Sequence, residues 1–330
     1  MVIKRDIYQP LILTIPDDTA LFSILDPEEE ITKKIVMENY INFYSFRDPQ
    51  YGNVVFRFEN FMDYESIVGL ERCFIPIDIM KKYYDDLDII IKLLTEGYGI
   101  TMPVARSCIS FYGNDAEGNH LLFIYGADTE RRNFFCKDFS GGKFVEFEVP
   151  FDAVKNSLAV YYRPFAKESD GLLAFRINKK ISPQIDYTKV YCEFHKLDQE
   201  YYSDEAGYGI GAVNMVLNDI KKRPFAYAAA GSWFNVCYFL LEASKLFNLR
   251  YKIFTNEPGL KQDKEVGSAG ADINKLFKDT NLLFLTVYRL HLKKINVLED
   301  VFKELVTLLC ICRDDLRVVV KYFCGAILEL

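Results

Sequence analysis

The side chains best suited to chemistry are a histidine and an aspartate that lie 18 positions apart, His120 and Asp138. Apolar residues at 121–125 and 133–137 predict two strands, with a turn at residues 126–128. His120 would open the first strand and Asp138 would end the second, so a hairpin would bring them together. A carboxylate beside an imidazole fixes its tautomer, and the imidazole can then act as a general base. The two residues are therefore two thirds of a nucleophile–His–Asp arrangement.

The nucleophile that would complete this arrangement is left open by the residue pattern. Cys73 precedes His120 in the chain, and Cys108 is expected on a strand that pairs with the His120 strand. Ser23 and Thr19 lie in a short predicted helix, where a hydroxyl would need a strong base to become a nucleophile. Each of the four also has a structural alternative, because buried thiols pack as small apolar groups and hydroxyls cap helices.

The remaining cysteines give no pattern typical of a metal site. Eight are scattered along the chain without the paired CxxC spacing of zinc ligands. Cys192 and His195 have ligand chemistry but no second pair, so we interpret them as a structural pair at a strand end. Cys136 lies two residues before Asp138 and would share its face of the strand, as a core thiol or as a further thiol candidate. We expect neither a metal nor a cofactor.

The composition limits the classes of protein to which this chain can belong. It has 330 residues, of which 50% are hydrophobic and 26% charged, as in globular proteins with a large core. A net charge of −7 and the lack of long Lys/Arg runs argue against a nucleic-acid surface. We see no signal peptide, and no apolar segment approaches the ~20 residues of a membrane span. We therefore expect a cytoplasmic protein without nucleic-acid or membrane partners.

The secondary-structure pattern predicts an α+β first half and a mainly helical second half. A helix is expected at residues 78–96, with strands at 100–104 and 108–112. After a last expected strand at 172–180, the alternation of apolar and polar residues that is typical of strands is mostly absent. The polar, Gly-rich residues 255–270 predict a loop. We place one domain at residues 1–165 and a second at 166–330. The helices predicted in the second half span residues 207–221, 226–247, 271–292 and 297–328.

The hairpin residues 120–128 and 134–139 resemble the second half of papain-like cysteine peptidases. The most similar branch contains bacteriocin-leader peptidases and the acyltransferase type of butirosin biosynthesis. Those proteins carry a His on a strand, a YGYD-like turn and an Asp or Asn one hairpin later, positions that His120 and Asp138 match here. The resemblance implies a papain-like fold with an antiparallel sheet in the first half. The family's cysteine lies at the start of an N-terminal helix, and the corresponding residues 17–23 contain none.

The resemblance implies a function in natural-product biosynthesis, as for proteins of antibiotic and nonribosomal-peptide clusters. We expect an acyltransferase or amide-bond-forming protein whose substrate is a thioester on the phosphopantetheine arm of an acyl or peptidyl carrier protein. His120 would deprotonate the acceptor amine or a nucleophile. The alternative is a catalytically inactive papain-like module that binds a peptide or a carrier-bound intermediate. A homodimer formed through the helical half is a further expectation.

Overall fold

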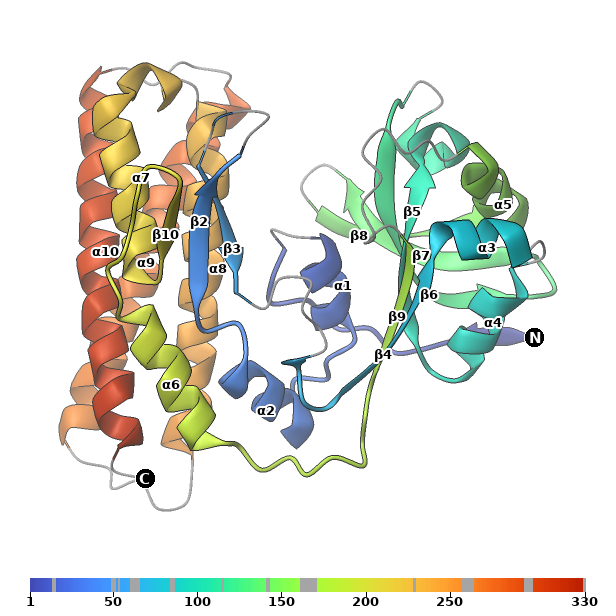
Figure 1. Ribbon diagram of the computed structural model, residues 1–330, viewed down its shortest axis with the longest axis horizontal. Coiled ribbons are helices and arrows are strands. Elements are labelled where there is room, and N and C mark those ends of the chain that lie inside the picture. The colour runs from blue at the N-terminus through green and yellow to red at the C-terminus, as the bar shows by residue number, and fades with distance from the viewer. Residues whose placement is uncertain are drawn as a thin grey trace. The chain divides into compact units, whose positions relative to one another are not determined.

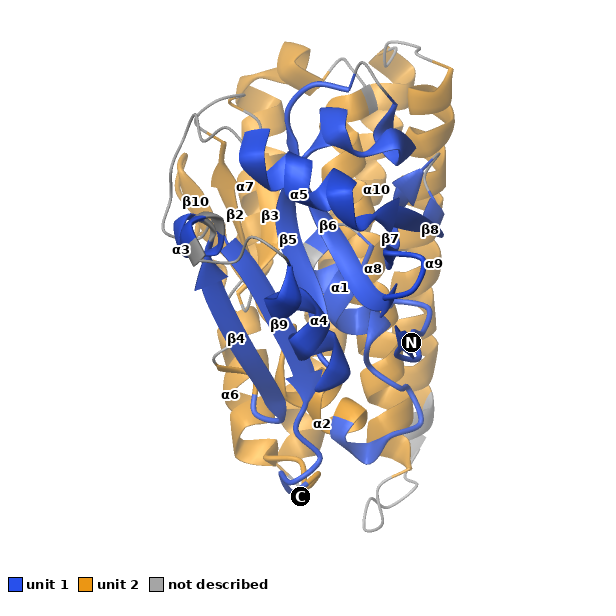
Figure 2. Ribbon diagram, turned by 90° about the vertical axis from the view of Figure 1, so that its right-hand side faces the viewer, with its two compact units in different colours: residues 1–31, 68–182 blue, residues 32–67, 183–330 orange. Residues whose placement is uncertain are grey.

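The computed structural model describes residues 1–13, 16–48, 52, 54–59, 66–83, 87–113, 116–140, 143–160, 171–227, 230–256, 264–293 and 299–328. The chain folds into two compact units, and it visits each of them twice (Figure 2). The first unit combines residues 1–31 with 68–182, and the second combines residues 32–67 with 183–330. These units differ from the expected division at residue 165, because strands distant in sequence pair within each unit.

A seven-stranded antiparallel sheet forms the first unit (Figure 1). Its strands follow the order β4-β9-β5-β6-β7-β8, and β1 pairs with β6 outside this path. The predicted α+β class with an antiparallel sheet is confirmed. The strands are β1 (Val2–Lys4), β4 (Leu70–Pro76), β5 (Gly99–Ala105), β6 (Asn119–Asp128), β7 (Asn133–Ser140), β8 (Lys143–Pro150) and β9 (Gly171–Ile177).

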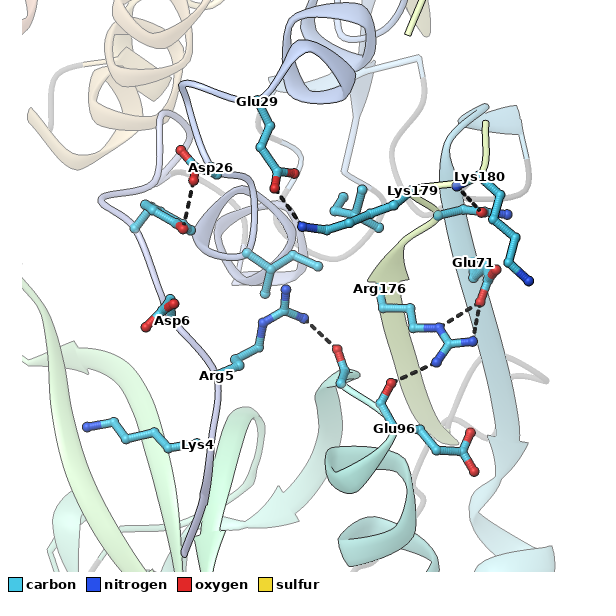
Figure 3. A pocket seen from close by; sticks show the side chains of 15 residues that line it. Lys4, Arg5, Asp6, Asp26, Glu29, Glu71, Glu96, Arg176, Lys179 and Lys180 are labelled. Atoms are coloured by element: carbon cyan, nitrogen blue, oxygen red, sulfur yellow. Dashed lines mark hydrogen bonds and ion pairs between the residues drawn. The ribbon is translucent and has the colours of Figure 1, made fainter. Parts of the chain in front are cut away.

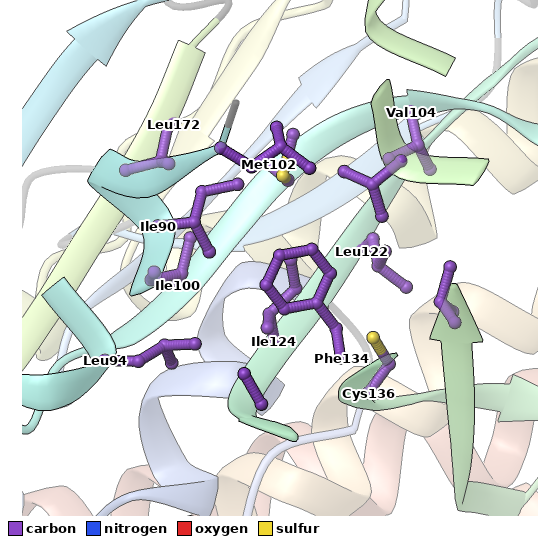
Figure 4. Close-up of a cluster of buried hydrophobic side chains, with 14 of the residues drawn as sticks. Ile90, Leu94, Ile100, Met102, Val104, Leu122, Ile124, Phe134, Cys136 and Leu172 are labelled. Carbon is purple, nitrogen blue, oxygen red and sulfur yellow. The ribbon is translucent and has the colours of Figure 1, made fainter. Parts of the chain in front are cut away.

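Helices cover both faces of this sheet (Figure 1). On one face, α3 (Ile77–Tyr83), α4 (Asp88–Thr95) and α5 (Phe151–Val160) enclose the apolar core of the unit. Figure 4 shows core side chains from several strands meeting there, among them Ile100, Leu122, Ile124, Phe134 and Cys136.

The other face of the sheet is covered by α1 (Pro16–Ser23). Ile24, which follows this helix, and the Phe123 ring both lie 3.1 Å from the point where a side chain at Gly99 would begin. A larger residue at this position would therefore have to displace the Ile24 or Phe123 side chain slightly.

The first unit departs from the sequence prediction at three places. The expected strand at 108–112 is instead two 3₁₀ turns, η2 (Arg106–Cys108) and η3 (Ser110–Tyr112). The expected turn at 126–128 belongs to β6, because β1 pairs along it and a side chain at Gly126 would meet the Ile3 carbonyl at 2.5 Å. The helix expected at 78–96 forms as α3 and α4, since Leu87 has a left-handed φ of 60°.

The second unit is mainly helical, as the pattern of its residues predicted. Its three-stranded sheet, in the order β10-β2-β3, joins residues from both of its chain segments. Helix α8 packs against α9, and α9 packs against α10. The elements are β2 (Phe43–Arg47), β3 (Val54–Phe58), α6 (Tyr187–Leu197), β10 (Ala206–Tyr208), α7 (Ile210–Lys222), η4 (Pro224–Tyr227), α8 (Ala230–Thr255), α9 (Lys264–Leu292) and α10 (Glu299–Ile327), and α2 (Glu30–Glu38) spans the boundary between the units.

Two expectations for this half are corrected. The Gly-rich end of the predicted 255–270 loop is helical, because α9 already begins at Lys264, while residues 257–263 lie outside the described part. Cys192 and His195 lie on α6 rather than at a strand end, and the His195 ring stacks on Tyr191. The three-residue spacing of Cys192 and His195 thus places them on adjacent turns of α6, a helix whose apolar side is buried.

A buried arginine holds the end of α2 in the second unit. The guanidinium of Arg250, on α8, donates to the carbonyls of Val36 at 3.0 Å and Asn39 at 2.6 Å. Such carbonyls at a helix end lack partners within the helix, so a donor from elsewhere stabilises them. Arg250 is fully buried, and the loss of hydration lowers its pKa to about 9.

Replacing Arg250 with alanine should destabilise the second unit. We expect a loss of about 3 kcal/mol in the free energy of unfolding, because two buried carbonyls lose their donors and a cavity opens. Urea unfolding followed by the helical circular-dichroism signal measures this loss. The control is Lys303→Ala, on the exposed side of α10, which should cost less than about 0.5 kcal/mol. Equal losses in the two variants would contradict the role assigned to Arg250.

Candidate functional site

The structure brings His120 and Asp138 together on neighbouring strands of the first unit. Nε2 of His120 lies 2.9 Å from Oδ2 of Asp138. In the register of β6 and β7, Phe123 is opposite Lys137. His120 and Asp138 are therefore diagonal neighbours that point to the same face of the sheet. The hairpin predicted from the sequence thus produces the expected pair, although its turn lies later in the chain.

The carboxylate of Asp138 is buried, accepts two hydrogen bonds and lies beside the His120 imidazole. Its side chain is only 2% exposed. Oδ2 accepts from the Tyr112 hydroxyl and lies 2.9 Å from Nε2 of His120, and Oδ1 accepts from the backbone N–H of Phe139 at 2.7 Å. A buried carboxylate needs such donors, because leaving water without them is costly. The position of Asp138 is consequently fixed before any ligand arrives.

Tyr112 is the member of this site that the sequence pattern did not reveal. Burial, followed by the neighbouring charge of Asp138, raises the pKa of the Tyr112 hydroxyl well above its usual value, so it remains a donor. Its ring meets His120 edge to face at a centroid distance of 5.2 Å. The Arg106 guanidinium lies 5.5 Å from the centre of the same ring. The sequence pattern predicted a strand for the segment that contains Tyr112. In the structure its ring contacts the rings of Phe111 and Phe147.

The His120 side chain is partly accessible to solvent. It is 32% exposed, compared with 2% for Asp138. The neutral imidazole can donate to Asp138 only if its proton is on Nε2, which leaves a lone pair on Nδ1. This arrangement can accept a proton from a group that approaches through solvent.

Cys136 shares the sheet face of Asp138 but packs as part of the core. Its side chain is fully buried among the apolar residues of the first unit (Figure 4). Burial, and then the charge of Asp138, raises the pKa of the Cys136 thiol well above its usual value. A thiol that resists ionisation is a poor nucleophile. The structure therefore supports the packing interpretation of Cys136.

The structure does not bring Cys73 to His120. Cys73 on β4 lies in one row across the sheet with Ala174, Ile100 and Ile124. Three strand spacings separate β4 from β6, which is roughly 14 Å, and His120 lies four residues beyond Ile124, roughly 13 Å along the strand. Cys73 is thus too far away to share a proton with His120.

The two hydroxyl candidates, Ser23 and Thr19, lie on the opposite face of the sheet. Helix α1, which carries both, packs on the face to which Phe123 points, and successive strand residues alternate between faces. His120 is three residues from Phe123 and points to the other face. Both hydroxyls are fully buried, and that of Ser23 donates to the Thr19 carbonyl at 2.7 Å.

Cys108 lies four residues after Val104, the residue that pairs with His120. It follows β5, but it lies in η2 rather than on the expected strand. The thiol is half-buried and free. No hydrogen bond joins it to His120 in the part of the chain that the structure describes. Cys108 is therefore not placed as the partner of the imidazole.

Comparisons of this sequence with protein-family models and with curated proteins found no match. Among the described residues, no three potential metal-ligating side chains gather in one place. None of the helices in the described part of the chain has an apolar stretch of the length that a bilayer crossing requires. The candidate site therefore rests on the geometry of His120, Asp138 and Tyr112.

The cysteines should differ sharply in their reaction with iodoacetamide. At neutral pH, Cys192 is exposed and should be modified first, while Cys136 and Cys237 should remain unmodified because burial raises their thiol pKa values. Peptide mapping by mass spectrometry gives the rate at each position, and Cys192→Ser should remove the fastest reaction. Faster modification of Cys73 or Cys108 than of Cys192 would reveal an activated thiol that this geometry does not provide.

Proposed function

We propose that the chain catalyses acyl transfer from a thioester to an amine, with His120 as the general base. The observation that supports this proposal is the pair of His120 and Asp138, in which a buried, fully hydrogen-bonded carboxylate orients a solvent-accessible imidazole. Such a pair is typical of sites that remove a proton during acyl transfer. The chemistry also fits the absence of a thiol or hydroxyl partnered with His120 among the described residues.

The proposed reaction needs no nucleophile from the protein. The acceptor amine attacks the thioester carbonyl and forms the new C–N bond, while Nδ1 of His120 takes the proton that the amine loses. The C–S bond then breaks, and Nδ1 of His120 returns this proton to the departing thiolate, which restores the neutral imidazole. Amines are good nucleophiles towards thioesters, so a positioned base can be sufficient.

The substrate class follows from the resemblance of the hairpin to papain-like proteins of antibiotic biosynthesis. On this basis the acyl donor is a thioester on the phosphopantetheine arm of a carrier protein, and the product is an amide in natural-product biosynthesis. We place the reaction in the cytoplasm, in line with eight cysteines that are all free. A homodimer through the helical unit stays a prediction.

The second candidate function is that of a binding module without catalysis. One observation favours it: Ser23, Thr19 and Cys73 all lie away from His120, so none of them can serve as its nucleophile. The imidazole and Asp138 would then contribute hydrogen bonds to a peptide or to a carrier-bound intermediate. The two candidates predict different effects of the same substitution.

Replacing His120 with alanine distinguishes the two functions. If His120 is the general base, the rate of amide formation from an acyl-pantetheine thioester and an amine should fall by about 10²–10⁴, because proton transfer loses its acceptor. Mass spectrometry of the amide product measures the rate. The binding of the acyl-pantetheine should change little. His195→Ala is the matched control, because His195 lies on α6 in the other unit.

The His120→Ala experiment has three possible outcomes. A loss of rate with binding retained supports the catalytic proposal, and a loss of binding in a protein that never forms amide supports the binding module. If neither rate nor binding changes in His120→Ala relative to His195→Ala, His120 is not part of a functional site.

A further inference from the structure

A second site is suggested by a pocket in the first unit, far from His120. The pocket has a volume of about 550 Å³. It is formed by the chain after β1, the chain after α1, the α4–β5 turn and the end of β9 (Figure 3). Gly97, which lines it, precedes one end of β5, whereas His120 pairs with Val104 near the other end. Seven residues of extended chain separate the two places, roughly 20 Å.

The guanidinium of Arg5 projects into this pocket (Figure 3). Its Nη1 donates to the Gly97 carbonyl at 2.9 Å, and its Nε is buried without a partner. No carboxylate forms an ion pair with it among the described residues. Loss of hydration lowers the pKa of Arg5, although nearby Tyr8, Asp6 and Glu29 act in the opposite direction. A partly dehydrated cation without a counter-ion favours an anion.

The other charged groups around Arg5 are largely satisfied by one another. Arg176 pairs with Glu71 at 2.6 Å, and Lys179 pairs with Glu29 at 2.7 Å. Asp26 accepts from the Tyr8 hydroxyl at 2.9 Å. Lys180 lines the pocket on the side away from Arg5 (Figure 3). Arg5 is thus the cation in the middle of the pocket that has donors to spare.

The backbone places Arg5 in this position without help from a ligand. The Arg5 N–H donates to the Tyr125 carbonyl at 3.3 Å, and the Tyr8 N–H donates to the Ser23 carbonyl at 2.8 Å. The segment that carries Arg5 is therefore attached both to the sheet and to the end of α1. A donor held in place in this way loses less entropy when it binds a ligand.

We infer that this pocket binds a small organic monocarboxylate through the Arg5 guanidinium. A guanidinium matches the planar geometry of a carboxylate. Carboxylates and cations line the pocket in equal number, so the lining has no net charge that would favour a dianion such as phosphate over a monoanion. Ile24 and Ile177 supply apolar surface for a short carbon chain. The site does not depend on the function proposed for His120.

Nuclear magnetic resonance of the whole chain tests this site, with isoleucine methyl groups labelled and sodium butyrate as the probe. We expect butyrate to shift the Ile24 resonance in a saturable way, whereas inorganic phosphate and butylamine should not. Arg5→Gln should weaken butyrate binding at least tenfold. The matched control is Arg131→Gln, because Arg131 lies in the same unit with a side chain that is 77% exposed.

Three results would overturn the inference. These are the absence of a saturable Ile24 shift in the unaltered protein, phosphate binding tighter than butyrate binding, and equal butyrate affinity in Arg5→Gln and Arg131→Gln. If Arg5→Gln does not fold, Arg5→Lys replaces it and should weaken binding by a smaller factor, because lysine keeps the charge without the planar donor geometry. Unchanged affinity in that variant would also contradict the role of Arg5.

Discussion

The candidate site depends on the burial of one carboxylate, that of Asp138. Its desolvation is compensated by hydrogen bonds from Tyr112 and from the Phe139 backbone, and by the close contact with Nε2 of His120. Each of these groups comes from a different part of the first unit, so the carboxylate connects η3, β7 and β6. The imidazole is 32% exposed and can therefore also reach solvent. Burial of Asp138 therefore fixes the orientation of the group that can do chemistry.

The two faces of the sheet determine which other residues can join this site. His120 and Asp138 point to the face that carries the apolar core, whereas α1 packs on the other face. A nucleophile from α1 would therefore need a different sheet geometry. The Arg5 pocket lies beyond the opposite end of β5. The His120–Asp138 site and the Arg5 pocket thus lie apart in the first unit, and each has its own supporting contacts.

Local features of the fold could be predicted from the sequence, and features that depend on distant pairing could not. The His120–Asp138 pair follows from a hairpin, whose strands are close in sequence. The place of Tyr112 in the site was not predicted, because the apolar residues of these 3₁₀ turns have the same sequence pattern as a strand. The unit boundaries were not predicted, because β9 inserts between β4 and β5, and β2 pairs with β10 from the second half of the chain. The unpaired donors of Arg5 depend on side-chain burial, which no local pattern reveals.

The central claim is that Asp138 holds His120 with the proton on Nε2 and the lone pair on Nδ1. Nitrogen-15 chemical shifts of the His120 ring, measured at a pH where the ring is neutral, test this claim most directly. The account predicts a protonated Nε2 and an unprotonated Nδ1 in the unaltered protein, and a loss of this preference in Asp138→Asn. A ring protonated on Nδ1, or a tautomer that is unaffected by Asp138→Asn, would contradict it.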